Sequence, residues 1–250
     1  MERQKDLYFK LYPAAHISLR YIYGFDVEGA ENIPDEPALY AANNLKMVDS
    51  LMMATAYTKH TGKAMRFGAK KEYFSGRGFS RHHNEDDGGT RLRWPHEIVM
   101  SRAAKWLVDN TLQVPVVREN GTREDLNVFF NSIHETLERG DSFGLHPEGT
   151  RSRDGRLYKF RYGIAHVAFR EMVPVVPVGI VYPPNKIDHE HILEEYGRKV
   201  IFGEPVFPRD FEHAPRRADA LNNELENRVA ALTGQEQANE LAKIYNKHNS

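Results

Sequence analysis

The residues best suited to chemistry form two polar turns, each following a short apolar segment. The first turn runs from Asn43 to Asp49, after the apolar residues 38–42. The second runs from His146 to Ser152, after residues 142–145. Open α/β sheets build their sites from polar turns at the carboxyl ends of core strands. The sequence therefore predicts that these two turns line one site.

The first turn has the frame of a base and its orienting acid, but it lacks the base. Asp49 lies five positions after Asn44. A histidine at position 44 would be held in one tautomer by the carboxylate, and it could deprotonate a hydroxyl that attacks a thioester, an effect worth about 10²- to 10⁴-fold. Asparagine has no useful basicity. Two structural alternatives are open: Asn43 and Asn44 cap a turn, and Asp49 caps the following helix.

The second turn, together with nearby cations, predicts an anion site. Arginine offers a planar fork that fits phosphate oxygens, and glycine lets backbone N–H groups approach a ligand. The structural alternative is an ion pair between Glu148 and an arginine that fixes the turn. The predicted members of the site are Lys70, Lys71, Arg118, Glu148, Gly149, Thr150 and Arg151.

Two further polar clusters have the residue types of metal ligands. One lies in the polar segment 75–95, which we predict to be a mobile insert, and the other lies near residue 190. Neither has a spacing that fixes a coordination geometry, so solvated loops are the favoured interpretation and no metal site is predicted. The clusters are His82, His83, Glu85 and Asp86, and His189, His191 and Glu194.

Composition limits the classes of function. The net charge of −1 over 250 residues provides no general attraction for nucleic acid, so no nucleic-acid partner is expected. The absence of cysteine excludes disulfides and thiol nucleophiles and fits a reducing compartment. The first residues lack the apolar core of a signal peptide, and the longest uncharged apolar run, 172–184, is too short to span a membrane. We therefore expect a cytoplasmic protein.

The elements that must position these turns alternate between strands and helices. This order predicts an α/β fold: a single domain with a largely parallel mixed sheet flanked by helices. We divide the chain into an N-terminal segment 1–24, a core 25–213 and C-terminal helices 214–250. The predicted strands are 25–28, 38–42, 64–69, 113–117, 142–145, 173–181 and 199–202. The predicted helices are 50–59, 97–110, 123–139, 162–170, 214–232 and 235–247.

Residues 1–24 form an amphipathic helical segment, with aromatic residues at helical spacing among cations and with Pro13 as a break. One interpretation is a helical pair packed on the core. The other is an arm on a membrane surface, with its aromatic side chains facing the lipid and its cations facing the headgroups.

Between about residues 24 and 206, the sequence resembles the glycerolipid acyltransferase family, which includes the 1-acylglycerol-3-phosphate acyltransferases. The family pattern Asn-His-x-x-x-x-Asp falls on Asn43, Asn44 and Asp49, and Phe-Pro-Glu-Gly-Thr-Arg-Ser falls on His146 to Ser152. Several ordered blocks together are far more specific than any one of them. The remaining blocks are Lys70 to Phe74, Val114 to Arg118, Phe160 to Gly163 and Val173 to Ile180.

The resemblance implies transfer of a fatty acyl group from acyl-CoA or acyl-carrier protein to a hydroxyl of a lysophospholipid such as lysophosphatidate. It implies no cofactor beyond that co-substrate. Position 44 would hold the base and Asp49 would orient it, while Arg118 and the Glu-Gly-Thr-Arg block would bind the acceptor phosphate. The N-terminal segment would contact the cytoplasmic face of a membrane, as in a peripheral membrane protein.

Two positions depart from the family pattern: Asn44 replaces the histidine, and His146 replaces the phenylalanine. Asn44 is either an engineered substitution that stops turnover or a natural one, which would give a non-catalytic homologue that binds lipid or acyl carrier, or an enzyme with another base. His146, together with the polar insert, also leaves open acyl transfer to a non-glycerolipid acceptor. His146 and His166 are the nearest alternative bases, and the sequence shows no orienting partner for either.

Overall fold

The computed structural model describes residues 2–46, 48–70, 113–116, 122–183, 197–238 and 240–241. Several predictions lie outside these ranges and stay predictions. They are the mobile insert 75–95, the helix 97–110, both metal-like clusters, Lys71 and Arg118.

The described strands form one sheet in the order β1-β7-β6-β2-β5-β3-β4. Neighbouring strands run parallel except β6 and β7, which are antiparallel. This sheet and its covering helices confirm the predicted α/β fold. The strands are β1 (Asp26–Glu28), β2 (Leu39–Ala42), β3 (Met65–Lys70), β4 (Val114–Val116), β5 (Ser142–Leu145), β6 (Val175–Val181) and β7 (Lys199–Phe202).

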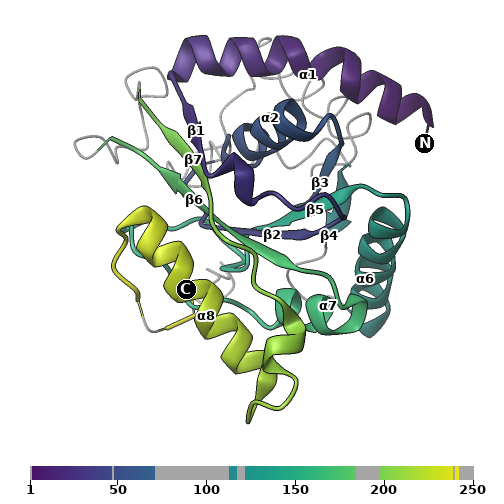
Figure 1. Cartoon of the computed structure of the whole chain (residues 1–250), viewed down its shortest axis with the longest axis vertical. Helices are drawn as coiled ribbons and strands as arrows, with labels where there is room; N and C mark the ends of the chain where they lie inside the picture. The colour runs from purple at the N-terminus through teal and green to yellow at the C-terminus, as the bar shows by residue number, and fades with distance from the viewer. Residues whose placement is uncertain are drawn as a thin grey trace, which may run out of the picture.

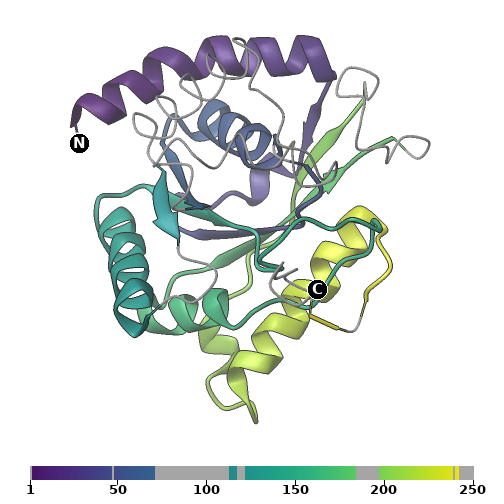
Figure 2. The ribbon, with the colours of Figure 1, turned by 180° about the vertical axis from the view of Figure 1, so that it is seen from behind.

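Helices cover both faces of the sheet, as Figures 1 and 2 show. One face carries α1 (Glu2–Tyr23) and α2 (Asp49–Thr61), and the other carries α6 (Arg123–Glu138), α7 (Gly163–Glu171) and α8 (Arg217–Thr233). Two short 3-10 helices, η1 (Ala30–Asn32) and η2 (Pro208–Phe211), lie in the connections. Alternation along β2 explains the two layers, because Tyr40 packs in the core under α2 while Leu39 packs in the opposite core.

The central strand β2 lies between β5 and β6 and is completely buried. Its run of apolar residues is typical of a parallel strand covered on both faces. Because β2 and β5 are parallel neighbours, with Ala41 opposite Leu145, their carboxyl ends meet at one edge of the sheet. The two polar turns begin at that edge.

The N-terminal segment is one helix rather than the predicted helical pair. Pro13 lies inside α1 without ending it. The helix packs against the core: the Tyr8 hydroxyl lies 2.6 Å from Thr58 Oγ1 on α2, and the His16 ring contacts the Phe25 ring edge-on. These tertiary contacts outweigh the local cost of a proline within a helix.

The predicted helix 235–247 is wrong over its described part. Gly234, with φ +70°, ends α8, and the chain then runs alongside residues 157–159. Leu157 N–H donates to Glu236 O at 2.9 Å, and Ala238 N–H donates to Leu157 O at 2.8 Å. These bonds to a distant segment replace the hydrogen bonds that a helix would have formed.

Candidate active site

The two polar turns are joined by backbone hydrogen bonds. Asn44 N–H donates to Glu148 Oε1 at 2.9 Å, and Ser152 N–H donates to Asn44 O at 2.7 Å. Position 44 therefore lies beside the Glu-Gly-Thr-Arg turn, at the carboxyl edge of β2 and β5. The structure brings together Asn44, Asp49 and the residues from Glu148 to Arg151, as the sequence predicted.

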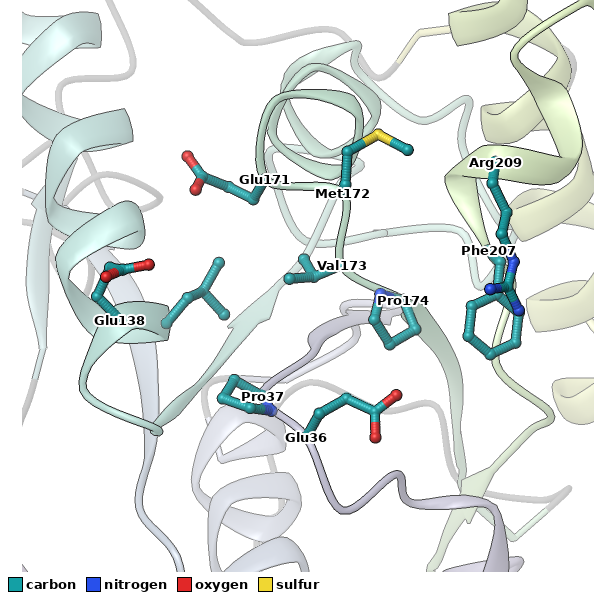
Figure 3. Close-up of a pocket in the computed structure, with 10 residues that line it drawn as sticks. Glu36, Pro37, Glu138, Glu171, Met172, Val173, Pro174, Phe207 and Arg209 are labelled. Carbon is teal, nitrogen blue, oxygen red and sulfur yellow. The ribbon is translucent and has the colours of Figure 1, made fainter.

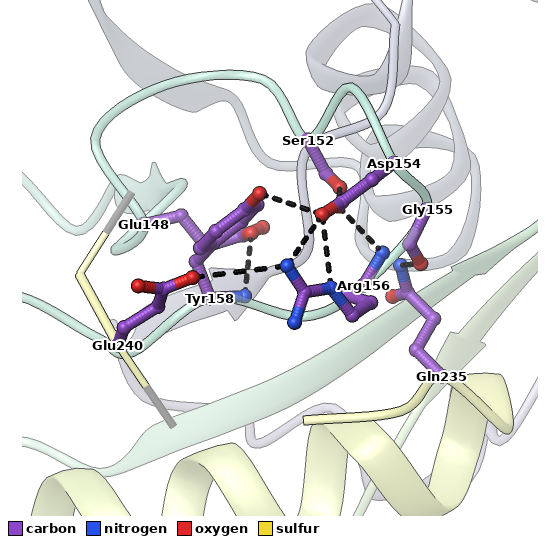
Figure 4. Close-up of polar contacts among 8 residues, drawn as sticks. All are labelled: Glu148, Ser152, Asp154, Gly155, Arg156, Tyr158, Gln235 and Glu240. Atoms are coloured by element: carbon purple, nitrogen blue, oxygen red, sulfur yellow. Dashed lines mark hydrogen bonds and ion pairs between the residues drawn. The ribbon is translucent and has the colours of Figure 1, made fainter. Parts of the chain in front are cut away.

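Glu148 stabilises this arrangement through hydrogen bonds in the protein interior. Its side chain is fully buried, and its second oxygen accepts from Tyr158 N–H at 3.0 Å, as Figure 4 shows. Burial raises the pKa of Glu148 to about 8, against the two backbone N–H bonds, which favour the charged form. The two carboxyl oxygens of Glu148 thus accept hydrogen bonds from backbone N–H groups. The ion-pair alternative required an arginine in their place. Direct contact between Glu148 and substrate stays a prediction.

Asp49 holds the first turn in shape. It is the first residue of α2, and its Oδ2 accepts from the N–H groups of Leu45 and Lys46, each at 2.7 Å. These donors precede the helix, so Asp49 closes the turn and does not cap α2; Val48 is in the N-cap position. Burial raises the pKa of Asp49 to about 6, while its hydrogen bonds oppose the rise.

A buried cation and a tyrosine complete the surroundings of Asp49. The Tyr182 hydroxyl donates to Asp49 Oδ1. The guanidinium of Arg198, which is 0% exposed, lies 4.5 Å from the centre of the Tyr182 ring, and its charge favours ionised Asp49. Sequence reasoning missed both residues, because a single Tyr and a single Arg far along the chain carry no local pattern.

Asn43 does not cap a turn, contrary to the structural alternative. Its amide exchanges two hydrogen bonds with the backbone of Ile180 in β6, at 2.8 and 2.9 Å. The same amide donates to Gln235 Oε1 at 2.9 Å, and Gln235 donates in turn to Gly155 O. Asn43 thus ties the end of β2 to β6 and to the segment after α8.

Gly149 has the backbone conformation that the turn requires. Its φ of +78° is in the left-handed region, and its N–H donates to His146 O at 3.0 Å. A Cβ at this position would lie 2.5 Å from Arg161 Nε. The Gly149 N–H is thus already bonded within the turn, and a place for Gly149 in the anion site stays a prediction. The next residues, half-buried Thr150 and exposed Arg151, lie at the surface of the turn.

The loop after the turn is held by Asp154. Its carboxylate accepts from the Ser152 hydroxyl at 3.2 Å and from Tyr158 OH at 2.8 Å, and it pairs with Arg156 at 2.8 Å (Figure 4). Arg151, which precedes this loop, is exposed, and the next residue, Ser152, donates its N–H to Asn44 O. Lys70 ends β3, so its backbone lies at the same carboxyl edge of the sheet.

Of the two alternative bases, His146 lies at the candidate site and His166 lies away from it. The exposed His166 lies on α7, where its ring contacts Phe130 of α6 at 4.9 Å between centres. His146 lies at the site: its Nδ1 is 2.9 Å from Asn43 O, and its Nε2 is 2.8 Å from Ser50 Oγ. The expectation that His146 lacks an orienting partner is therefore wrong.

A cavity of about 330 Å³ lies away from these turns (Figure 3). Its lining includes Pro37 and Pro174, which lie just before β2 and β6, and Glu138 and Glu171 at the ends of α6 and α7. These positions belong to the amino edge of the parallel strands, opposite the two turns. The chemistry of the candidate site is not built from this cavity.

Two further features are absent from the residues that the structure describes. These residues contain no cluster of three or more His, Asp or Glu residues that could hold a metal ion. In the same part of the chain, no helix is both long and apolar enough to cross a membrane.

Comparison with known proteins points to one family. The Acyltransferase family profile matches residues 81–181. A chloroplastic 1-acyl-sn-glycerol-3-phosphate acyltransferase of Arabidopsis thaliana is 28% identical over 86% of this chain and 51% of its own length. A Brassica napus protein of the same description is 27% identical over 86% of the chain and 53% of its own length. The chain thus spans about half the length of these relatives.

A solved structure shares the fold. The crystal structure of the 1-acyl-sn-glycerophosphate acyltransferase PlsC from Thermotoga maritima is similar with a TM-score of 0.56 at 20% identity. The match covers 92% of this chain and 80% of the other.

Proposed function

We propose that the chain is a glycerolipid acyltransferase that transfers an acyl group from a thioester donor to a hydroxyl of a lysophosphatidate-like lysophospholipid, a proposal supported by its similarity to the Acyltransferase profile and to the plant relatives. The observation that carries the proposal is the hydrogen-bonded pair of turns, with position 44 beside exposed Arg151. A lysophosphatidate-like acceptor has its reacting hydroxyl a few bonds from its phosphate. Such an acceptor needs one group at the hydroxyl, at position 44, and a cation at the phosphate, which Arg151 provides. The donor is acyl-CoA or acyl-carrier protein, whose thioester supplies the leaving group.

Some residues of the proposed site hold its structure, and others bind the ligand. Glu148 and Asp49 hold the two turns through backbone N–H groups, so the backbone at position 44 is fixed between them. Arg151, which offers two parallel N–H donors, binds the acceptor phosphate. Thr150 lies beside it, and Lys70 and Arg118 complete the proposed anion site.

The direct test compares the unaltered chain with Asn44→His. Acylation of lysophosphatidate is followed by thiol release from acyl-CoA and by carrier deacylation. The histidine restores a base at position 44, so Asn44→His should transfer acyl groups to lysophosphatidate. Transfer to an unphosphorylated monoacylglycerol should be slower, because that acceptor lacks the phosphate that Arg151 binds. If neither chain acts on any lysolipid with either donor, the proposed function is wrong.

Arg151→Gln tests the phosphate contact. Loss of a charge-assisted bidentate contact should raise KM for lysophosphatidate about tenfold or more and leave monoacylglycerol use unchanged. Arg153→Gln is the matched control, because Arg153 is exposed in the same loop. Equal effects of the two substitutions would remove Arg151 from the phosphate site.

A second candidate is a non-catalytic protein that binds lysolipid or acyl carrier. The observation that favours it is Asn44 itself, together with an Asp49 carboxylate already bonded to Leu45, Lys46 and Tyr182. This candidate predicts that the unaltered chain binds lysophosphatidate in calorimetry and releases no thiol from acyl-CoA. Turnover by the unaltered chain excludes it.

We also propose that α1 attaches the protein to the cytoplasmic face of a membrane. Ile17 and Tyr21 are four residues apart on one face of α1 and are 67% and 85% exposed. They lie outside the contacts that Tyr8 and His16 make with the core. Exposed apolar side chains on an amphipathic helix are typical of a lipid-facing surface.

A further inference from the structure

His146 and Ser50 have the geometry of a base and a hydroxyl. The imidazole Nε2 lies 2.8 Å from Ser50 Oγ. On the other side of the ring, Nδ1 lies 2.9 Å from Asn43 O and 3.3 Å from Ala42 O. A hydroxyl, an imidazole and a third group that orients the ring form the arrangement found where a side chain takes up a proton.

The contacts of Nδ1 set the tautomer of the ring. A carbonyl oxygen only accepts hydrogen bonds, so Nδ1 must carry the hydrogen that faces Asn43 O. In the neutral ring, Nε2 then has the lone pair and accepts from the Ser50 hydroxyl. The backbone of β2 thus gives His146 the orientation that a carboxylate gives to many catalytic histidines.

The pair lies where position 44 lacks a base. The carbonyl that orients His146 belongs to Asn43, and Ser50 follows Asp49 in the first turn of α2. The ring also stacks on Phe67 of β3, with 6.2 Å between ring centres and 26° between planes. Both His146 and Ser50 are only half-buried, so the pair is not sealed within the core.

We propose that His146 is the general base of this chain, acting through Ser50 in place of a base at position 44. This inference rests on the proposed acyl transfer. The acceptor hydroxyl attacks the thioester carbonyl, forming the new C–O bond as the C–S bond breaks. Its proton passes to Ser50 Oγ while the Ser50 proton passes to His146 Nε2. The departing thiolate then takes one proton back by the same route, and both side chains return to their starting states.

A purely structural pair would look the same at rest, because a bond from Ser50 to His146 also ties α2 to the end of β5. The two roles differ in one respect. A base at His146 is needed only while position 44 lacks one, whereas a structural bond is needed in either case.

The test is therefore a double-mutant cycle with acyl-CoA and lysophosphatidate. His146→Phe should lower kcat/KM of the unaltered chain by about 10²-fold or more, the usual worth of a general base. In the Asn44→His background, His146→Phe should change kcat/KM by less than about fivefold, because the base at 44 then acts alone. His166→Phe is the control, and it should leave both backgrounds unchanged. Urea unfolding identifies any variant that fails to fold, and His146→Gln then replaces His146→Phe.

Ser50→Ala tests the relay separately. Removing the hydroxyl should lower kcat/KM of the unaltered chain and leave the Asn44→His background nearly unchanged. Mass spectrometry after incubation with acyl-CoA alone should show no acyl group on Ser50. A stable acyl-Ser50 ester overturns the relay, since Ser50 would then be a nucleophile.

The outcomes distinguish this inference from the proposed function. An active Asn44→His variant beside an inactive unaltered chain overturns the role of His146 and keeps the acyltransferase. Equal loss on His146→Phe in both backgrounds assigns the residue to structure. If no variant acts on any lysolipid, the proposed function fails, and the role of His146 fails with it.

Discussion

Glu148 determines the geometry of the candidate site more than its place in the turn 146–152 indicates. Its two oxygens accept from backbone N–H groups on either side, at Asn44 and Tyr158. We therefore expect replacement of this acid to change the distance between position 44 and Arg151, even if neither of those residues is altered. The same burial makes the residue sensitive to pH.

Stability should fall as pH rises through the range in which Glu148 titrates. Its pKa is about 8 in the folded protein and near 4.5 otherwise, so between these values the folded state holds a proton that the unfolded state has released. The free energy of unfolding then declines by up to about 1.4 kcal/mol per pH unit. Urea unfolding at pH 5.5 and pH 8 measures this decline.

Glu148→Gln should flatten that profile, since the amide does not titrate. In this variant the free energy of unfolding should still decline slightly with rising pH, because the pKa of Asp49 is also raised, to about 6. At pH 5.5 the variant should be less stable by about 1–3 kcal/mol, because glutamine has one acceptor oxygen for two backbone N–H groups. An unchanged slope would show that Glu148 titrates alike in both states.

At the scale of elements, α6 shows how a local signal can fix a boundary. Thr122 accepts from Asp125 N–H at 3.1 Å, and the Asp125 carboxylate accepts from Thr122 N–H at 2.9 Å. This capping box fixes the start of the helix, which packs Ile133 and Leu137 against β5 and its neighbours.

Thr122→Ala should lower the free energy of unfolding by about 1 kcal/mol, the usual cost of losing an N-cap side chain. Thr122→Ser keeps the hydroxyl and is the matched control, with a change well below that. Urea unfolding at one pH compares the three chains. Similar loss in both variants would show that the methyl group, rather than the cap, stabilises this end of α6.

Elements with a strong local pattern were predictable. Strand 199–202 was predicted with its observed bounds, and 123–139 differed from α6 by one residue. Failures came where distant contacts decide. Nothing near Pro13 indicates that α2 supports a continuous helix, and nothing near Gln237 indicates that Leu157 pairs with it. The roles of Tyr182 and His146 depend in the same way on contacts with residues about a hundred positions or more away.

At the scale of the whole molecule, α1 lies over α2 and leaves one side open to the surroundings (Figure 1). Ile17→Glu with Tyr21→Glu should reduce sedimentation with vesicles of anionic phospholipid, because charge replaces the exposed apolar surface that we propose faces lipid. Lys59→Gln, an exposed change on α2, is the control for charge alone. Equal binding by the double variant and the unaltered chain would place membrane contact elsewhere.

The order of the strands also constrains how the protein is made. On a ribosome, β1 emerges long before its partner β7, because Asp26 lies opposite Lys199, far later in the sequence. The central strand β2 also lacks its partners at first, because both of its neighbours in the sheet, β5 and β6, are synthesised later. Pairings so distant in sequence are slow to form and leave strand edges open meanwhile. The nascent chain therefore carries β1 and β2 without their partner strands until those strands are synthesised, and the sheet is completed only after residue 202 has left the exit tunnel.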